Sequence, residues 1–271
     1  MDITKQALGF KVTKYGISAK SSPKRLLGRQ GRHKLPSQQL HVPLQGACVK
    51  PRQPLRLRVN EVSVNEKQAQ AVMHELVVAG KVTDPVSPRG KLLQTAAHLF
   101  RSKGYERTTV RDLASAVGIQ SGSIFHHFKS KDEILRAVME ETIVYNTALM
   151  QAALAQSHTT RERLLALIRC ELQSIMGGTG EAMAVLVYEW RSLSATAQEQ
   201  VLALRDIYEQ LWLEVLNQAQ KEGFFAGDPF IQRRFLTGAL SWTTTWFRPG
   251  GPMTLDQLAE EALSLVCKGA H

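Results

Sequence analysis

Apolar residues recur at helical spacing along most of the chain from about residue 90 onward. In the stretch Gly90–Lys103 they fall at i, i+4, i+7 and i+8 and so share one face of a helix: Leu92, Ala96, Leu99 and Phe100. Gly104 follows directly and can adopt the left-handed backbone that ends many helices. The pattern predicts a helix that packs one side against a core.

Further helices follow, and capping residues mark their starts. A capping box of Ser130 and Glu133 is expected to open the longest helix of the first group. We expect three helices here: Thr109–Val117, about residues 120–127, and Ser130 to about Ala155. Five more are expected after them: Thr159–Ile175, Glu181–Trp190, Thr196–Lys221, Asp228–Trp246 and Thr254–Gly269. No strand pattern occurs among these elements, so the predicted fold class is all-α.

The first third of the chain has a different composition. Residues 1–87 contain fifteen Lys/Arg against five Asp/Glu, six prolines, and two of the eighteen aromatic residues, Phe10 and Tyr15. Apart from a short apolar stretch at about Ala69–Val78, no helical or strand period persists. So little apolar surface cannot offset the entropy of ordering the chain. We therefore expect a disordered basic extension over residues 1–87.

Three interpretations of this extension remain open. It could be a nonspecific nucleic-acid-binding arm, a targeting sequence, or a translated upstream region, with Met73 as an alternative start. We favour the third. A targeting sequence is the least favoured, because the prolines and the lack of an amphipathic helix do not suit a transit peptide.

Charge and cysteine content exclude several classes of protein. The formal net charge of +10 lies entirely in residues 1–87, since residues 88–271 hold nineteen basic and nineteen acidic residues. No stretch approaches the roughly 20 apolar residues of a membrane-spanning helix, and no secretory signal is recognisable. The three cysteines form no C-x-x-C pair. We expect a protein of the cytoplasm with no membrane association, no disulfide framework, no metal site and no cofactor.

Two short helices joined by a turn at Gly118, between a supporting helix and a long one, are the ingredients of a helix-turn-helix. Ile119, Ile124 and Phe128 are expected to point inward. A plain helical hairpin in a bundle is the alternative. Charge favours DNA binding, because residues 88–138 hold nine basic and four acidic residues, whereas residues 139–271 hold ten and fifteen.

The stretch Ala96–Leu135 resembles the N-terminal DNA-binding domain of the TetR/AcrR family of bacterial transcriptional regulators. The resemblance rests on these segments: Ala96-Ala97-His98-Leu99-Phe100, Gly104-Tyr105, Thr108-Thr109-Val110, Leu113-Ala114, Val117-Gly118-Ile119, Gly122-x-Ile124-Phe125, His127-Phe128, Ser130-Lys131 and Ile134-Leu135. At residues 125–128 the chain has Phe-His-His-Phe where the family most often has Tyr-Tyr-His-Phe.

The resemblance implies a role for each matching position. Thr109 would cap the second helix of the motif and touch a phosphate. The candidate base or groove contacts are Gln120, Ser121, Ser123 and His126. The candidate phosphate contacts are His127, Lys129 and Lys131. The adjacent histidines have no ligand spacing around them, and we interpret them without a metal.

The resemblance further implies three domains or segments: the extension 1–87, a helix-turn-helix DNA-binding domain 88–134, and a ligand-binding and dimerisation domain 135–271. Members act as homodimers on palindromic operators in double-stranded DNA. The last two helices, roughly residues 228–247 and 254–268, correspond in position to the pair that dimerises.

The C-terminal part is similar to regulators that sense acyl-CoA or other lipid-like molecules, in the segments Glu189–Ser194 and Trp242–Gly251. Candidate pocket residues are apolar side chains with two arginines that could meet a carboxylate or phosphate: Met150, Met183, Trp190, Trp242, Arg191 and Arg248. Ordinary core packing with surface arginines is the alternative.

The sequence thus predicts a sequence-specific transcriptional regulator, a repressor released by a small apolar or acyl-type effector, acting at the bacterial nucleoid. No arrangement typical of a catalytic site occurs, so an enzyme is not predicted. The alternative function is a nonspecific nucleic-acid-binding protein that uses its basic N-terminal arm.

Overall fold

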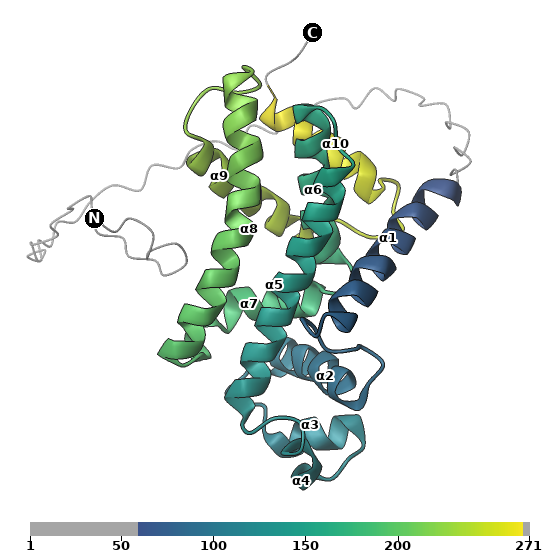
Figure 1. Cartoon of the computed structure of the whole chain (residues 1–271), viewed down its shortest axis with the longest axis vertical. Helices are drawn as coiled ribbons and strands as arrows, with labels where there is room; N and C mark the ends of the chain where they lie inside the picture. Colours follow the sequence, from purple (N-terminus) through teal and green to yellow (C-terminus); the bar gives the residue numbers. More distant parts are fainter. Residues whose placement is uncertain (1–58, 268–271) are drawn as a thin grey trace, which may run out of the picture. The chain divides into compact units, whose positions relative to one another are not determined.

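The computed structural model describes residues 59–267, with side chains from Glu66 onward, and the described part is helical without strands. The prediction of an all-α fold is confirmed. The α-helices, shown in Figure 1, are α1 (Val59–Val78), α2 (Pro88–Lys103), α3 (Val110–Val117), α4 (Ser121–Ile124), α5 (Lys131–Ala155), α6 (Thr160–Met176), α7 (Gly180–Tyr188), α8 (Ala195–Lys221), α9 (Pro229–Trp242) and α10 (Leu255–Val266).

Helices α2, α3 and α4 gather at one end of the bundle and form a small head (Figure 1). Its core consists of side chains that are at most 1% exposed: Phe100, Leu113, Ile124 and Phe128. Gly118 ends α3 with φ 80° and ψ 31°, a left-handed conformation that a residue with a side chain rarely adopts. The tight turn between α3 and α4 therefore depends on this glycine.

Helix α5 connects the head to the body, which is formed by α6 to α10. Its first turns place Ile134 and Leu135 in the core of the head, and one turn before its end Met150 lies in the core of the body. Helix α8 likewise contributes to both cores, with Val201 in the first and Trp212 in the second. Two long helices thus couple the head to the body by continuous packing.

The prediction that residues 1–87 lack structure is wrong for residues 66–87. Helix α1 occupies Val59–Val78, and its Val72 and Leu76 pack, together with Val82, against an apolar face of α5 that includes Val144 and Ala148. The apolar stretch at Ala69–Val78 was the sequence signal for this helix, but only contact with α5 gives it a partner. Residues 1–58 of the predicted extension lie outside the described residues.

The proposed alternative start, Met73, lies inside α1 and packs, half-buried, with the same cluster. A chain beginning there would have only part of this helix. The segment from α1 to α2 is therefore part of the fold around α5, and the boundary predicted at residue 87 does not separate structured from unstructured chain.

Smaller differences concern the ends of helices. Helix α4 is confined to Ser121–Ile124, and turns cover the rest of the predicted 120–127 segment. The Ser130 hydroxyl accepts from the backbone N–H of Glu133 as expected, but the Glu133 carboxylate accepts from the N–H of Lys129, so the predicted reciprocal box is incomplete. Helix α9 ends at Trp242 and continues as a short 3₁₀ turn, Thr243–Thr245.

Candidate nucleic-acid interface

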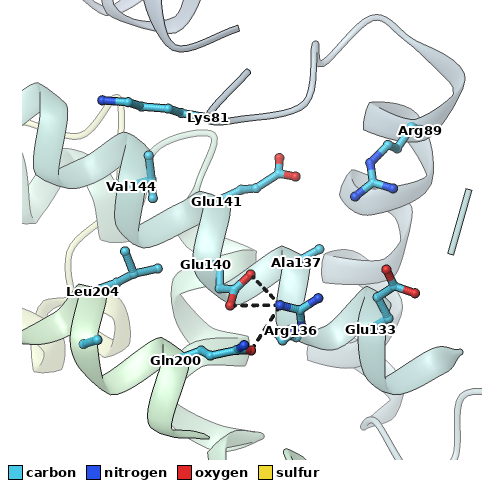
Figure 2. A pocket seen from close by; sticks show the side chains of 11 residues that line it. Lys81, Arg89, Glu133, Arg136, Ala137, Glu140, Glu141, Val144, Gln200 and Leu204 are labelled. Atoms are coloured by element: carbon cyan, nitrogen blue, oxygen red, sulfur yellow. Dashed lines mark hydrogen bonds and ion pairs between the residues drawn. The ribbon is translucent and has the colours of Figure 1, made fainter. Parts of the chain in front are cut away.

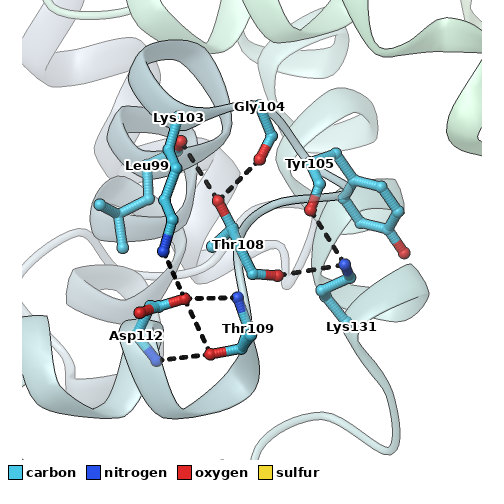
Figure 3. Close-up of polar contacts among 8 residues, drawn as sticks. All are labelled: Leu99, Lys103, Gly104, Tyr105, Thr108, Thr109, Asp112 and Lys131. Atoms are coloured by element: carbon cyan, nitrogen blue, oxygen red, sulfur yellow. Dashed lines mark hydrogen bonds and ion pairs between the residues drawn. The ribbon is translucent and has the colours of Figure 1, made fainter.

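The start of α3 is fixed by a complete capping box. The Thr109 hydroxyl accepts from the backbone N–H of Asp112 at 3.1 Å, and Asp112 Oδ2 accepts from the backbone N–H of Thr109 at 2.7 Å (Figure 3). Lys103 Nζ donates to the same carboxylate oxygen at 2.7 Å. These contacts, led by the Lys103 hydrogen bond, hold the pKa of Asp112 well below its usual range. The capping role predicted for Thr109 is confirmed.

Lys131 is turned inward at the start of α5. Its Nζ donates to the carbonyl oxygens of Tyr105 at 2.9 Å and Thr108 at 3.1 Å, and it lies 4.0 Å from the centroid of the Tyr105 ring (Figure 3). Two of the three ammonium hydrogens are thereby used. Lys131 thus ties the loop before α3 to α5. Its third hydrogen is not used by these contacts, so the phosphate contact stays a prediction.

The two residues whose carbonyls Lys131 binds, Tyr105 and Thr108, are buried. Thr108 is fully buried and donates its hydroxyl to the carbonyl of Gly104 at 2.8 Å, and Tyr105 packs edge-on against Phe100 at 5.2 Å between ring centroids. Burial raises the pKa of Tyr105 to about 12, so its hydroxyl stays protonated at physiological pH. The sequence analysis assigned Lys131 to a phosphate from the family resemblance and from its place at the start of a helix, where free backbone N–H groups favour an anion.

The residues predicted to contact bases or the DNA groove lie on and beside α4. Gln120 and His126 are exposed, and Ser121 and Ser123 are half-buried. Ile124 and Phe128 are buried as expected and fasten this segment to the head, whereas Ile119, expected inward, is 36% exposed. Because α4 is anchored from one side only, its polar side chains lie on a surface that a DNA groove can reach.

The two remaining candidates for phosphate contact lie just after α4. Lys129 is exposed, with its backbone N–H bonded to Glu133, and His127 is half-buried. The carbonyl of His127 accepts from Arg89 Nη1 at 2.6 Å. The side chains of both residues remain available for an anion.

Arg89 is a structural residue that the sequence analysis missed. Its guanidinium lies 3.9 Å from the centroid of the Phe128 ring, and its Nε donates to the Thr83 hydroxyl at 3.2 Å. Thr83 in turn donates from its N–H and hydroxyl to the two carboxylate oxygens of Glu141 on α5, at 2.9 and 2.8 Å. Arg89 in the first turn of α2 is thus bonded to the residues after α4, and through Thr83, in the segment before α2, it is linked to α5.

A signal for Arg89 did exist in the sequence. A basic side chain in the first turn of a helix is unfavourable for the helix dipole, and Arg89 follows directly after Pro88 at the start of α2. Such a residue needs a partner from elsewhere in the fold, and here the His127 carbonyl, the Phe128 ring and Thr83 provide it.

A pocket of about 520 Å³ opens where the segment before α2 meets α5 and α8. Figure 2 shows its lining, in which Lys81, Arg89 and Arg136 alternate with Glu133, Glu140 and Glu141. Arg136 is bonded to Glu140 and to Gln200. Burial raises the pKa of Glu140. None of the six predicted pocket residues lines this space.

The structure does not bring the six predicted pocket residues together. Met150 is fully buried in the core around α6 and α8, whereas Met183 and Trp190 pack with the other core, next to α2 and α5. Trp242 is 66% exposed on α9, which contradicts its predicted place inside the body of the single chain. Arg191 and Arg248 are exposed, after α7 and α9 respectively.

Neither a metal-binding cluster nor a membrane-spanning helix is found in the part of the chain that the structure describes. Between residues 59 and 267 no group of three or more His, Cys, Asp or Glu side chains is arranged to hold a metal ion. No helix within the same residues is long and apolar enough to cross a membrane.

Comparisons with known proteins match the two parts separately. A family described as bacterial regulatory proteins, tetR family, matches residues 92–138, and one described as tetracyclin repressor-like, C-terminal domain, matches residues 157–270. The HTH-type transcriptional repressor KstR2 of Mycobacterium tuberculosis is 32% identical over 71% of this chain and 96% of its own length.

Solved structures agree with this assignment. The structure of KstR2, titled a ketosteroid transcriptional regulator, has a TM-score of 0.61 at 30% identity and covers 69% of this chain and 96% of that one. A structure titled superantigen pfit is 72% identical, has a TM-score of 0.66 and covers 74% of this chain and 100% of that one. AibR, solved in complex with isovaleryl coenzyme A and operator DNA, shares the fold at 23% identity, with a TM-score of 0.60, and covers 66% of this chain and 97% of that one.

Proposed function

Because the chain belongs to the tetR family of bacterial regulatory proteins, it is a DNA-binding transcriptional regulator, and we propose that it is a homodimeric repressor released from a palindromic operator by a small apolar or acyl-type effector. The observation that carries the proposal is the head, in which buried Ile124 and Phe128 hold α4 so that Gln120 and His126 face outward. The proposal assigns no catalytic step to the chain and places it at the bacterial nucleoid.

The residues in contact with DNA are proposed to divide into two groups. His127 and Lys129, with the start of α3 at Thr109, would bind phosphates and set the position of the head. Gln120, Ser121, Ser123 and His126 would contact base edges, since amide, hydroxyl and imidazole groups can donate and accept hydrogen bonds in the major groove.

Dimerisation is proposed to use α9 and α10. Helix α9 exposes four large apolar side chains, Phe230, Ile231, Phe235 and Trp242, of which Phe235 is 72% exposed. Leu265 on α10 is 86% exposed. An apolar surface of this kind on a single chain is typical of an interface, and a two-fold dimer would set the spacing of the two heads at one helical turn of DNA, about 34–36 Å.

A small apolar or acyl-type effector is supported by two relatives' names. KstR2 is titled a ketosteroid regulator, and AibR of the same fold was solved with isovaleryl coenzyme A. An effector would release DNA by binding more tightly to a conformation in which the two heads no longer fit successive grooves.

The proposal is tested by selecting bound DNA from a random pool with the full chain. We expect an enriched palindrome. His127→Ala and Lys129→Ala should weaken binding to all sequences to a similar degree, whereas Gln120→Ala should change the preference at particular base pairs. Enrichment of no sequence, with steep salt dependence, would instead support the nonspecific basic arm.

A second candidate function comes from the 72% identical structure titled superantigen pfit. Because the match covers the whole of that chain, stimulation of T cells as a superantigen is the second function to test for this chain. The test is proliferation of T cells mixed with antigen-presenting cells and purified protein, with heat-unfolded protein as the control. Equal responses to both samples would exclude it.

A further inference from the structure

A charged cluster lies inside the body, between α6, α8 and α9. Arg233 of α9 is only 3% exposed, and its guanidinium lies 3.8 Å from a carboxylate oxygen of Glu171 and 3.8 Å from one of Glu209. The hydroxyl of Tyr208 donates to Glu171. The face of the guanidinium lies 4.4 Å from the ring centroid of Trp212, which is fully buried. These charges belong neither to the DNA-binding surface nor to the exposed face of α9.

Hydrogen-bond donors in this cluster outnumber the acceptors that reach them. Among the described residues, no partner reaches the buried Nε and Nη1 of Arg233, the Nη1 of Arg205 or the indole Nε1 of Trp212. One acceptor of the cluster, Oε1 of Glu209, is also without a hydrogen bond. Both carboxylates lie beyond hydrogen-bond distance of the Arg233 guanidinium. Buried polar groups are nearly always hydrogen-bonded in folded proteins, so four unpaired donors in one region point to a missing acceptor.

The cluster also contains more positive than negative side chains. Among the buried and half-buried side chains of the cluster, the arginines 205, 233 and 234 face two glutamates, 171 and 209. Burial lowers the pKa of Arg205 to about 10, yet the side chain still carries its charge at physiological pH. The group that would satisfy these donors is therefore an anion with several acceptor oxygens.

Glu209 lies where such a group would enter. Its side chain is 22% exposed, and one of its carboxylate oxygens is within 3.4 Å of Arg234, which is 34% exposed. The Glu209 carboxylate is thus a partly exposed group whose Oε2 lies 3.8 Å from Nε of Arg233. Its distance from that nitrogen is too long for a hydrogen bond, so an oxyanion with better geometry could displace it toward Arg234.

We propose that Arg233, Arg205 and Trp212 form an internal binding site for the oxyanion of a small apolar acid, with the Glu209 carboxylate as its occupant in the absence of ligand. The apolar part of the ligand would lie against the neighbouring core, to which Trp212, Leu236 and Leu240 contribute. This inference rests on the proposed function, since it names the chemical class of the effector. It also locates the effector on α9, the helix that exposes Phe235 and Trp242.

The first experiment is calorimetric titration of the full chain with three probes of equal chain length: decanoate, decyl phosphate and decanol. The two oxyanions should bind at least ten-fold more tightly than decanol, and the tighter of the two identifies a carboxylate or a phosphate as the natural group. Equal binding of decanol and decanoate, or no binding of either oxyanion, would overturn the proposal.

The second experiment uses charge variants with a matched control. Glu209→Gln removes the competing carboxylate and should tighten oxyanion binding several-fold without changing decanol binding. Glu214→Gln makes the same change on the same helix, at a residue that is 68% exposed and pairs with Arg163, and should have no effect. Arg233→Lys keeps the charge but loses the planar fork and should weaken oxyanion binding at least ten-fold, with folding checked by circular dichroism. Unchanged affinity in both Glu209→Gln and Arg233→Lys contradicts the site.

Operator binding is measured separately on the same samples. If no operator is bound by any variant, the proposed repressor function fails, while oxyanion binding still decides the site. If the operator is bound and decanoate or decyl phosphate neither binds nor releases it, the site fails and the repressor function stands.

Discussion

The head and the body differ in whether their buried polar groups are hydrogen-bonded. In the head, Lys131 donates to the carbonyls of Tyr105 and Thr108, and the Thr108 hydroxyl donates to the carbonyl of Gly104. In the body, Arg233 is buried with two nitrogens that find no partner among the described residues. Hydrogen-bonded buried groups make the head rigid, so that it can fit one shape of DNA. Unpaired groups leave the body ready to gain stability from a ligand.

The largest expected effect is in the body. Arg233→Met should lower the free energy of unfolding by about 3–5 kcal/mol, because it leaves Glu171 as a buried charge without its partner. Combining it with Glu171→Gln should restore stability to the wild-type level or above, since replacing both members of a buried ion pair is often neutral or stabilising. Urea unfolding of the ligand-free proteins measures both. A double variant as unstable as the single one would show that the pair stabilises the body.

The next effect is in the head. Lys131→Met should cost about 1–3 kcal/mol, because two buried carbonyls lose their donor. Lys129→Met, two residues earlier and exposed, is the matched control and should leave the midpoint of unfolding unchanged. Equal midpoints for both variants would show that the two carbonyl contacts of Lys131 do not stabilise the head.

Arg89 tests whether the segment before α2 stabilises the head. Arg89→Met removes the bonds to the His127 carbonyl and to Thr83 and should cost about 1.5 kcal/mol. It should also weaken operator binding, because the end of the recognition segment loses its support. Arg101→Met on the same helix, where the exposed arginine lies 5.5 Å from the Tyr188 ring centroid, should change neither quantity. Identical behaviour of the two variants would contradict a role for Arg89.

The cap of α3 should contribute less. Thr109→Ala removes the acceptor for the Asp112 N–H and should cost about 1 kcal/mol. Thr109→Ser keeps the hydroxyl and serves as the control. Thermal unfolding compares the three proteins, and a stable Thr109→Ala variant would show that the turn at Gly118 fixes α3 without its cap.

The smallest effect concerns pH. The pKa of Asp112 is lowered on folding, so its contribution to stability is present above the unfolded value of about 4 and is lost as pH falls toward the folded value. The stability difference between wild type and Asp112→Asn should therefore shrink between pH 5 and pH 3. Because Asp112 is exposed, raising the salt concentration should reduce this difference as well. A difference independent of pH would contradict this origin.

Local patterns were sufficient where an interaction closes within a few residues. The caps at Thr109, Thr159 and Thr254 and the turn at Gly118 involve partners no more than four residues away, and the structure has each of them. The head was predictable for the same reason, since its motif spans about 40 continuous residues. The proposed reading positions on and beside α4 follow from that motif and remain a prediction.

Predictions failed where the partner lies far away in the sequence. Helix α1 depends on α5, some seventy residues later, and the direction of Lys131 depends on carbonyls 23 and 26 residues earlier. The six pocket residues came from a local resemblance to lipid-sensing regulators and from apolar side chains of the body, but neither signal can tell a face that meets the core from one that meets solvent or a second chain. Trp242 lies on the second kind of face.

The sequence by itself determined the all-α class, the starts and ends of most helices and the position of the DNA-binding head, because periodicity and capping act over one or two helical turns. Tertiary structure alone decided that α1 packs on α5, that Lys131 points inward and that Arg233 lies buried beside Glu171 and Glu209. These outcomes depend on which distant groups share a low-dielectric interior, where an unpaired charge or donor is costly, and no local pattern encodes that.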